Sequence, residues 1–182
     1  MLDHKGTKTI NTSRLILRKF VASDAVPMFR NWASDPEVTR YLTWPAHENA
    51  YISQKIVDLW VSDYDKPDFY QWAIVLKEIN EPIGSISVVA KDDSVPWVEI
   101  GYCIGKRWWH QGIVSEALQA VIEFFFREVG VVRIQAKHNV NNPNSGAVMK
   151  KCGMTLEGTL RSAYRDNQGL CDLCQYAIIK ED

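Results

Sequence analysis

Three strand-like segments follow one another closely in the middle of the sequence, and the longest helical pattern comes directly after them. The strands are expected over 71–77, 82–90 and 97–104, with polar residues typical of turns between them. The helix is expected over 112–129, where apolar residues recur at helical spacing. Consecutive strands joined by short turns pair antiparallel, so a doubly wound nucleotide-binding fold is not expected.

The flanking segments complete an α/β (α+β) pattern. Further strands are expected over 14–20, 133–138, 155–161 and 170–180, and further helices over 23–33, 49–62 and 142–153. Pro36 is expected to end the first of these helices. We predict one domain over residues 1–182, with a polar leader over 1–12. Its mixed, mostly antiparallel sheet should have about seven strands flanked by about four helices.

The composition of the chain argues against two classes of partner, nucleic acids and membranes. The chain has 21 basic and 22 acidic side chains, whereas proteins that wrap nucleic acid usually carry a basic excess. No apolar run approaches the ~18 residues of a spanning helix, and the N-terminus lacks the apolar core of a signal peptide. We therefore expect a cytoplasmic protein with no nucleic-acid or membrane partner, and we leave a homodimer open.

The four cysteines suit a reducing compartment. Cys171 and Cys174 form a C-x-x-C pair, a spacing found in zinc and redox sites. The segment around them has the pattern of a strand, in which positions three apart face opposite sides. We therefore expect these cysteines to be structural, and we expect no metal site.

The loop between the strand ending at Ile104 and the helix beginning near Gly112 is the strongest candidate binding site. The start of a helix exposes unpaired backbone N–H groups and the positive end of the helix dipole, which attract phosphate. A glycine such as Gly112 lets a phosphate approach the backbone closely. The alternative is that Gly112 merely starts the helix.

Two motifs occur in compatible order. The first is the strand Glu99–Ile104 followed by the loop WHQGIV over 109–114, and the second is N-x-x-S-x-x-V-x-x-K-x-G-M over 142–154. Together they resemble the acetyl-coenzyme A (acetyl-CoA) binding core of the GNAT acetyltransferase superfamily, and more narrowly its RimJ/RimL-type ribosomal-protein N-acetyltransferase branch. The resemblance covers about residues 14–180 and implies a GNAT-like fold.

The resemblance implies that acetyl-CoA is the co-substrate and that its acetyl group passes directly to an amine. The implied contacts to the coenzyme are Ile104, Gln111, Gly112, Val114, Ser115, Asn142 and Lys151. Asn142 could equally be the cap of its helix. Val114 stands where the superfamily usually has Gly or Ala, which is compatible with the resemblance if its side chain points to the core.

The resemblance also implies the catalytic groups. The backbone N–H of Cys103 would polarise the acetyl carbonyl, while its thiol is dispensable. Glu99 lies four residues earlier on the same face of the strand and is the candidate base, unless it only pairs with a neighbouring Lys or Arg. Ser145 or Tyr164 would protonate the departing thiolate, because Met149 stands where many members have a tyrosine.

The acceptor is expected to be the N-terminal α-amine of a protein. An α-amine has a pKa near ~8 and a lysine near ~10.4, so the α-amine loses its proton more easily at neutral pH. A small amine (polyamine or antibiotic) and a non-catalytic acyl-CoA-binding module are the alternatives. Tyr41, Trp44 and the first two helices should shape the acceptor cleft. His47 is expected to be exposed to solvent, with a place in the lining of this cleft as the alternative. An open cleft would suit a peptide, and a closed aromatic one a small molecule.

Overall fold

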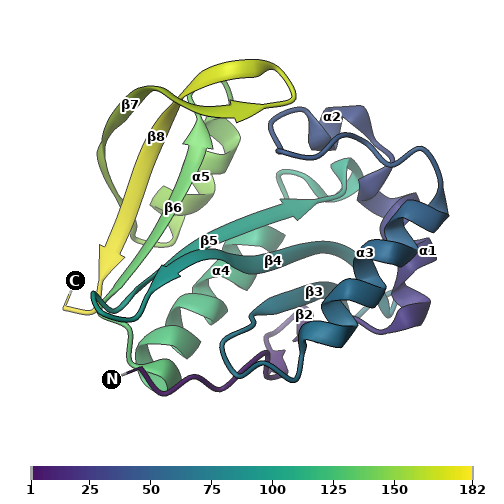
Figure 1. Ribbon diagram of the computed structural model, residues 1–182, viewed down its shortest axis with the longest axis horizontal. Coiled ribbons are helices and arrows are strands. Elements are labelled where there is room, and N and C mark those ends of the chain that lie inside the picture. Colours follow the sequence, from purple (N-terminus) through teal and green to yellow (C-terminus); the bar gives the residue numbers. More distant parts are fainter. Residues whose placement is uncertain (1, 182) are drawn as a thin grey trace.

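The computed structural model describes residues 2–181, which form a mixed eight-stranded sheet with helices on both faces (Figure 1). The strands are β1 (Ile10–Asn11), β2 (Leu15–Arg18), β3 (Gln71–Leu76), β4 (Glu81–Asp92), β5 (Trp97–Ile104), β6 (Arg133–Asn139), β7 (Thr155–Asp166) and β8 (Gly169–Ile179). Their order is β1-β2-β3-β4-β5-β6-β8-β7. Only β5 and β6 pair in parallel. The predicted fold class is confirmed, but the predicted number of strands omitted β1, a two-residue strand without a pattern.

The helical segments follow the predicted order with two short additions. They are η1 (Ala22–Asp24), α1 (Ala25–Met28), η2 (Phe29–Ala33), α2 (Pro36–Thr39), α3 (Ala50–Asp63), η3 (Lys106–Trp108), α4 (Ile113–Phe124), η4 (Phe125–Val129) and α5 (Pro143–Lys151). One added helix is η3, which lies within the predicted loop. The other is α2, which begins at Pro36 and is capped by Asp35, whose side chain accepts a hydrogen bond from Glu37 N at 2.8 Å. The preceding helix ends at Ala33, before Pro36, as expected. Within residues 2–181, no helix is long and apolar enough to cross a membrane.

Two hydrophobic cores lie on opposite faces of the sheet. Side chains of α4, including Leu118, pack against one face, and α5 joins them through Met149. The other core lies on the face of the sheet that α1 and α3 cover (Figure 1). Trp32 from η2 and Val57 from α3 are fully buried there. Alternation along β5 sends Ile100 to the α4 core, while Cys103 packs on the α1–α3 side.

The strands β5 and β6 diverge along their length. They pair over only three residues, from Trp97 opposite Arg133 to Glu99 opposite Gln135. Beyond this point β5 leans toward α2 and β6 toward the β7–β8 hairpin (Figure 1). The residues of β5 from Ile100 to Ile104 therefore have no strand partner on the β6 side. This split in the sheet positions the candidate site.

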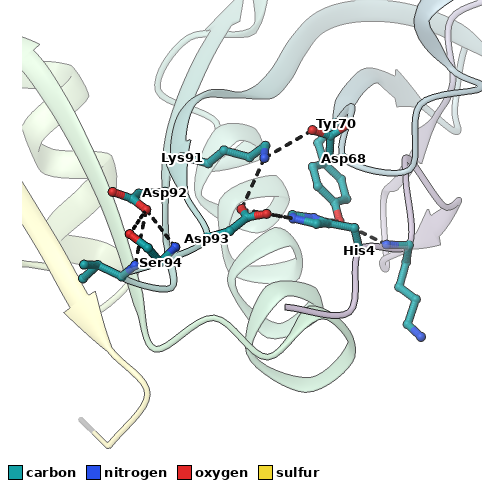
Figure 2. A network of polar contacts seen from close by, with 9 residues as sticks. His4, Asp68, Tyr70, Lys91, Asp92, Asp93 and Ser94 are labelled. Atoms are coloured by element: carbon teal, nitrogen blue, oxygen red, sulfur yellow. Dashed lines mark hydrogen bonds and ion pairs between the residues drawn. The ribbon is translucent and has the colours of Figure 1, made fainter. Parts of the chain in front are cut away.

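The described part of the expected leader, residues 2–12, hydrogen-bonds to the sheet. Thr7 Oγ1 accepts a hydrogen bond from Gln71 N at 3.0 Å. His4 Nδ1 lies 3.0 Å from the Tyr70 hydroxyl, and His4 Nε2 lies 3.2 Å from the Asp93 carboxylate (Figure 2). The N-terminal segment is thus fastened to the start of β3 and to the turn after β4.

Candidate active site

A cavity of about 700 Å³ lies at the split between β5 and β6. Its lining includes Tyr102, His138 and Ser145 from the α4–α5 side, and Trp32 and Trp60 from the α1–α3 side. The cavity therefore reaches both faces of the sheet through the gap that the diverging strands leave. Its volume lies in the range of small-molecule sites, roughly 300–1,000 Å³.

The start of α4 has the geometry of an anion site. Gly112 is the N-cap and has a φ of 72°, a left-handed conformation that favours glycine. The hydrogen bond from Glu116 N to Gly112 O, at 3.1 Å, begins the helix, so the N–H groups of the first turn have no helical acceptor. The Val114 side chain points into the core, which is the orientation that makes valine at this position compatible with the family resemblance. Ser115 is also buried.

Two cations converge on this helix start. A Cβ atom built on Gly112 would lie 3.4 Å from Lys151 Nζ and 3.8 Å from the Arg14 guanidinium. Arg14 is held there by Gln111 O, at 3.0 Å, and by Glu116, at 2.7 Å. A diphosphate at the α4 start would therefore meet backbone donors and two positive side chains. Sequence reasoning missed Arg14, because one basic residue before a strand carries no signal.

The predicted coenzyme contacts fall into two groups. Gln111, Gly112, Val114, Ser115 and Lys151 surround the α4 start, whereas Asn142 lines the cavity. The Asn142 side chain makes no cap hydrogen bond to α5.

Ile104 ends β5 between these two groups. Its carbonyl accepts a 3.0 Å hydrogen bond from Trp109 Nε1, which fixes the loop that leads to α4.

Glu99 lies where the split begins and lines the cavity. Its Oε2 accepts a hydrogen bond from Gln135 Nε2 at 2.8 Å and pairs with Lys137 Nζ at 2.8 Å. The ion pair with a neighbouring lysine, which was the alternative to a catalytic role, is therefore present. Lys137 nevertheless lines the same cavity as Glu99. The carboxylate is 14% exposed, and it can accept a proton from a group bound in the cavity.

The thiol of Cys103 is a packing group. Its Sγ lies 3.4 Å from Ser85 Oγ, and burial raises the pKa of the thiol. A thiol with a raised pKa stays protonated at neutral pH and is a poor nucleophile. Direct transfer without an acyl-enzyme is consistent with this environment.

The strand register does not favour the backbone N–H of Cys103 as the carbonyl donor. Gly105 N donates to Ile83 O on β4 at 2.9 Å, and Cys103 pairs with Ser85 two residues along the same ladder. Main-chain groups two residues apart in a strand point the same way, so the Cys103 N–H faces β4. The N–H groups of the residues on either side, Tyr102 and Ile104, face the split instead.

Ser145 is held by a residue that the sequence did not single out. The Tyr102 hydroxyl donates to Ser145 O at 2.9 Å and lies 3.0 Å from Ser145 Oγ. Burial raises the pKa of Tyr102, so the phenol keeps its proton at neutral pH. The Ser145 hydroxyl is thereby placed at the edge of the cavity, beside the start of α5.

Tyr164 reaches the cavity from β7, near Glu99. Burial and the negative charge of Glu99 raise the pKa of Tyr164, while a hydrogen bond with the Thr43 side chain lowers it. Its phenol is therefore protonated at neutral pH. The cavity thus brings together all four predicted catalytic residues, Glu99, Cys103, Ser145 and Tyr164.

On the α1–α3 side, aromatic side chains line the cavity. The β7–β8 hairpin and the loop that carries Trp44 form a roof over it. Tyr41 and Trp44 line it as predicted. Asn167, in the β7–β8 turn, donates to Thr39 O at 2.8 Å and to Trp44 O at 2.7 Å, which ties this hairpin over the loop. His47 is buried rather than exposed, and burial lowers its pKa.

Unsatisfied polar atoms also mark this cavity. Among the described residues, Trp32 Nε1 and His138 Nε2 are the buried side-chain polar atoms without a hydrogen-bond partner, and both residues line it. Buried polar groups are rarely left unpaired, so each such atom calls for an explanation, of which a partner bound in the cavity is one. Over residues 2–181, no group of three or more His, Cys, Asp or Glu side chains is arranged to hold a metal.

Comparisons with known proteins agree with this geometry. The family described as "Acetyltransferase (GNAT) domain" matches residues 14–155. The uncharacterized N-acetyltransferase YoaA of Bacillus subtilis is 30% identical, over 94% of this chain and 96% of its own. The ribosomal-protein-serine acetyltransferase of Escherichia coli is 36% identical over 58% of this chain and 59% of its own. The structure of RimL, a ribosomal L7/L12 α-N-protein acetyltransferase in complex with coenzyme A, is 25% identical, with a TM-score of 0.84 over 94% of this chain and 98% of its own.

The fold and these matches define an acyltransferase. The family match covers well over half of the sequence, and this chain belongs to the GNAT family of acetyltransferases.

Proposed function

We propose that this protein transfers the acetyl group of acetyl-CoA to a primary amine, and that the acceptor is the N-terminal α-amine of a protein. One observation carries the proposal: β5, whose residues from Glu99 to Cys103 line the cavity at the split, leads through the loop after Ile104 into the cation-flanked start of α4. The name of RimL, an α-N-protein acetyltransferase, supports an α-amine acceptor, and the name of the E. coli relative supports a ribosomal protein as its carrier.

Coenzyme binding is assigned to the α4 start and to one edge of the split. The backbone N–H groups from Gly112 to Ser115, together with Arg14 and Lys151, would hold the diphosphate. The free amide of Asn142 would contact the arm of the coenzyme that enters the cavity.

Transfer requires two proton movements, and the cavity offers a group for each. Glu99 accepts the proton of the attacking amine as the C–N bond forms. The Tyr102 N–H, which faces the split, donates to the acetyl oxygen. As the C–S bond breaks, Ser145 or Tyr164 supplies a proton to the sulfur. No acyl-enzyme is formed on Cys103.

A small amine is the second candidate acceptor. It is favoured by the roof over the aromatic side of the cavity, where Asn167 fastens the β7–β8 hairpin to the loop that carries Trp44. A closed pocket suits a small ligand better than an extended chain.

An acetyl-transfer screen tests both candidates. Purified protein and acetyl-CoA are incubated with peptides that have free N-termini and with small amines, and released thiol and acetylated product are measured together. The proposal predicts turnover of peptides. Turnover of small amines alone would favour the second candidate, whereas saturable coenzyme binding without any turnover would indicate a binding module.

A further inference from the structure

We infer that the acceptor carries an apolar group of aromatic size beside its amine and that it is not a polycation. This inference rests on the proposed function of the same cavity. It concerns the α1–α3 side, where the part of the acceptor that does not react must lie. Its basis is the composition, charge and enclosure of that side.

The walls on this side are apolar and pre-organised. They include Met28, Trp32, Ile56 and Trp60. The Trp60 ring packs against Phe20 at a centroid distance of 4.8 Å and is thereby fixed.

The roof is also fixed in place. The Trp44 ring lies 5.2 Å from His47, and the Trp44 backbone carbonyl is held by Asn167. An apolar group of the acceptor would leave water for a site that is already formed, so little binding energy is lost to ordering the protein.

The charges in the cavity disfavour a second ammonium group. Glu99 is the one carboxylate among the described lining residues, and it is already paired with Lys137 at 2.8 Å. Burial lowers the pKa of His47, so this ring adds no charge at neutral pH. An additional ammonium would be buried without a carboxylate partner, next to the Lys137 cation, which is strongly unfavourable. Polyamines and aminoglycosides are therefore expected to be poor acceptors.

Matched amino-acid amides test this inference. The amides of phenylalanine, leucine, serine and lysine share the same α-amine and differ in the neighbouring group. We expect kcat/KM for the phenylalanine and leucine amides to be roughly tenfold or more above that for the serine and lysine amides. Equal values, or the highest value for lysine amide or spermidine, would overturn the inference.

A second set of substrates distinguishes a chain terminus from a small molecule as the source of the amine. The rate with phenylalanine amide is compared with that of the tripeptide Phe-Gly-Gly, and the rate with serine amide with that of Ser-Gly-Gly. A preference for Phe over Ser in both pairs supports the inference. A higher rate for the tripeptides then identifies a chain terminus as the source, and a higher rate for the amides identifies a small molecule.

Variants of residues that line the cavity test whether its α1–α3 side causes the preference for apolar acceptors. Trp44→Ala should lower the ratio of phenylalanine to serine amide turnover, whereas Tyr51→Ala, on the exposed side of α3, should leave it unchanged. Gln71→Glu adds a second carboxylate to the cavity with little change of shape, and it should raise the relative rate with lysine amide. An unchanged preference in both cavity variants would contradict the inference.

The outcomes also separate this inference from the proposed function. Equal turnover of all four amides would reject the inference and leave acetyl transfer standing. Binding of acetyl-CoA in calorimetry with no turnover of any acceptor would reject both.

Discussion

Glu99 and Lys137 form an ion pair directly beside the point where β5 and β6 separate, with 2.8 Å between Oε2 and Nζ. Gln135 donates a second hydrogen bond to the same oxygen, so the carboxylate is fixed in orientation. Both charged residues line the cavity. In the proposed mechanism, this carboxylate receives the proton of an amine that approaches from the α1–α3 side.

Replacing Glu99 by Gln should lower kcat most strongly at neutral pH. A general base contributes about 10²–10⁴-fold, and its loss matters less at high pH, where the amine is already deprotonated. The ratio of wild-type to variant kcat, measured across pH, should therefore fall as pH rises. Glu157→Gln is the matched control, because Glu157 pairs with Arg133 on the sheet outside the cavity. A ratio that does not change with pH would exclude Glu99 as the base.

Gly112→Asp should abolish coenzyme binding, because it places a carboxylate where the diphosphate is expected. Gly112→Asn is the control, since asparagine imposes similar strain at a φ of 72° without the charge. Calorimetric titration with coenzyme A should show no binding to the Asp variant and weakened binding to the Asn variant. Equal affinity in these two variants would contradict the phosphate assignment at the α4 start.

Lys151→Met should weaken the affinity for coenzyme A and reduce its dependence on salt concentration. The ammonium of Lys151 faces the α4 start, and attraction between exposed charges is screened by salt. Lys150→Met, one residue earlier and also exposed, is the control and should leave the affinity unchanged. An equal loss of affinity for coenzyme A in both variants would show that the position of the positive charge beside the α4 start is unimportant.

The sequence predicted the long elements and the loop at Gly112, because helical periodicity and strand alternation are local signals. It did not predict β1 or α2, which are too short to show a period. The roof over the cavity also escaped sequence reasoning. It depends on hydrogen bonds from Asn167 to a loop more than 120 residues earlier in the chain.

At the candidate site, the sequence predicted the direction of a side chain where that direction depends on a single element. Val114 points inward because it follows the helix cap by two residues. The donor at the split was assigned to Cys103, whereas the ladder turns the Cys103 N–H toward β4. Which backbone N–H groups face a neighbouring strand depends on the hydrogen-bonding pattern between the two strands, and the alternation of side chains within one strand does not show that pattern.

Cys103→Ala should retain acetyl transfer with a kcat close to that of the wild type. The residue is half-buried, burial raises the pKa of its thiol, and Sγ lies 3.4 Å from Ser85 Oγ. Steady-state kinetics provide the measurement, and mass spectrometry of the wild type after incubation with acetyl-CoA should show no acetylated protein thiol. Complete loss of activity in the variant would support an acyl-enzyme on Cys103.

Glu116→Gln should destabilise the protein at neutral pH but not in strong acid. Burial alone would raise the pKa of Glu116, but hydrogen bonds from Thr12, Arg14 and Ser13 hold it at about 2, below its ordinary value of 4.5. The folded state therefore binds this proton more weakly than the unfolded state. The stabilisation is complete above pH 4.5 and is lost as pH falls toward 2.

Urea unfolding at several pH values measures this effect. The free energy of unfolding should fall by roughly 1 kcal/mol in the variant at pH 7, since these hydrogen bonds are partly screened by solvent. Glu123→Gln, which removes a surface pair with Arg127 on the same helix, should change stability less. A difference between Glu116→Gln and the wild type that stays constant down to pH 2 would contradict the assignment.

A crystal structure of the protein with acetyl-CoA tests the central claim most directly. The account predicts the diphosphate at the N–H groups between Gly112 and Ser115, with Arg14 and Lys151 beside it. It predicts the acetyl group within the split, next to the Tyr102 N–H and facing Glu99. Acetyl-CoA bound elsewhere, or side chains filling the split in the complex, would contradict it.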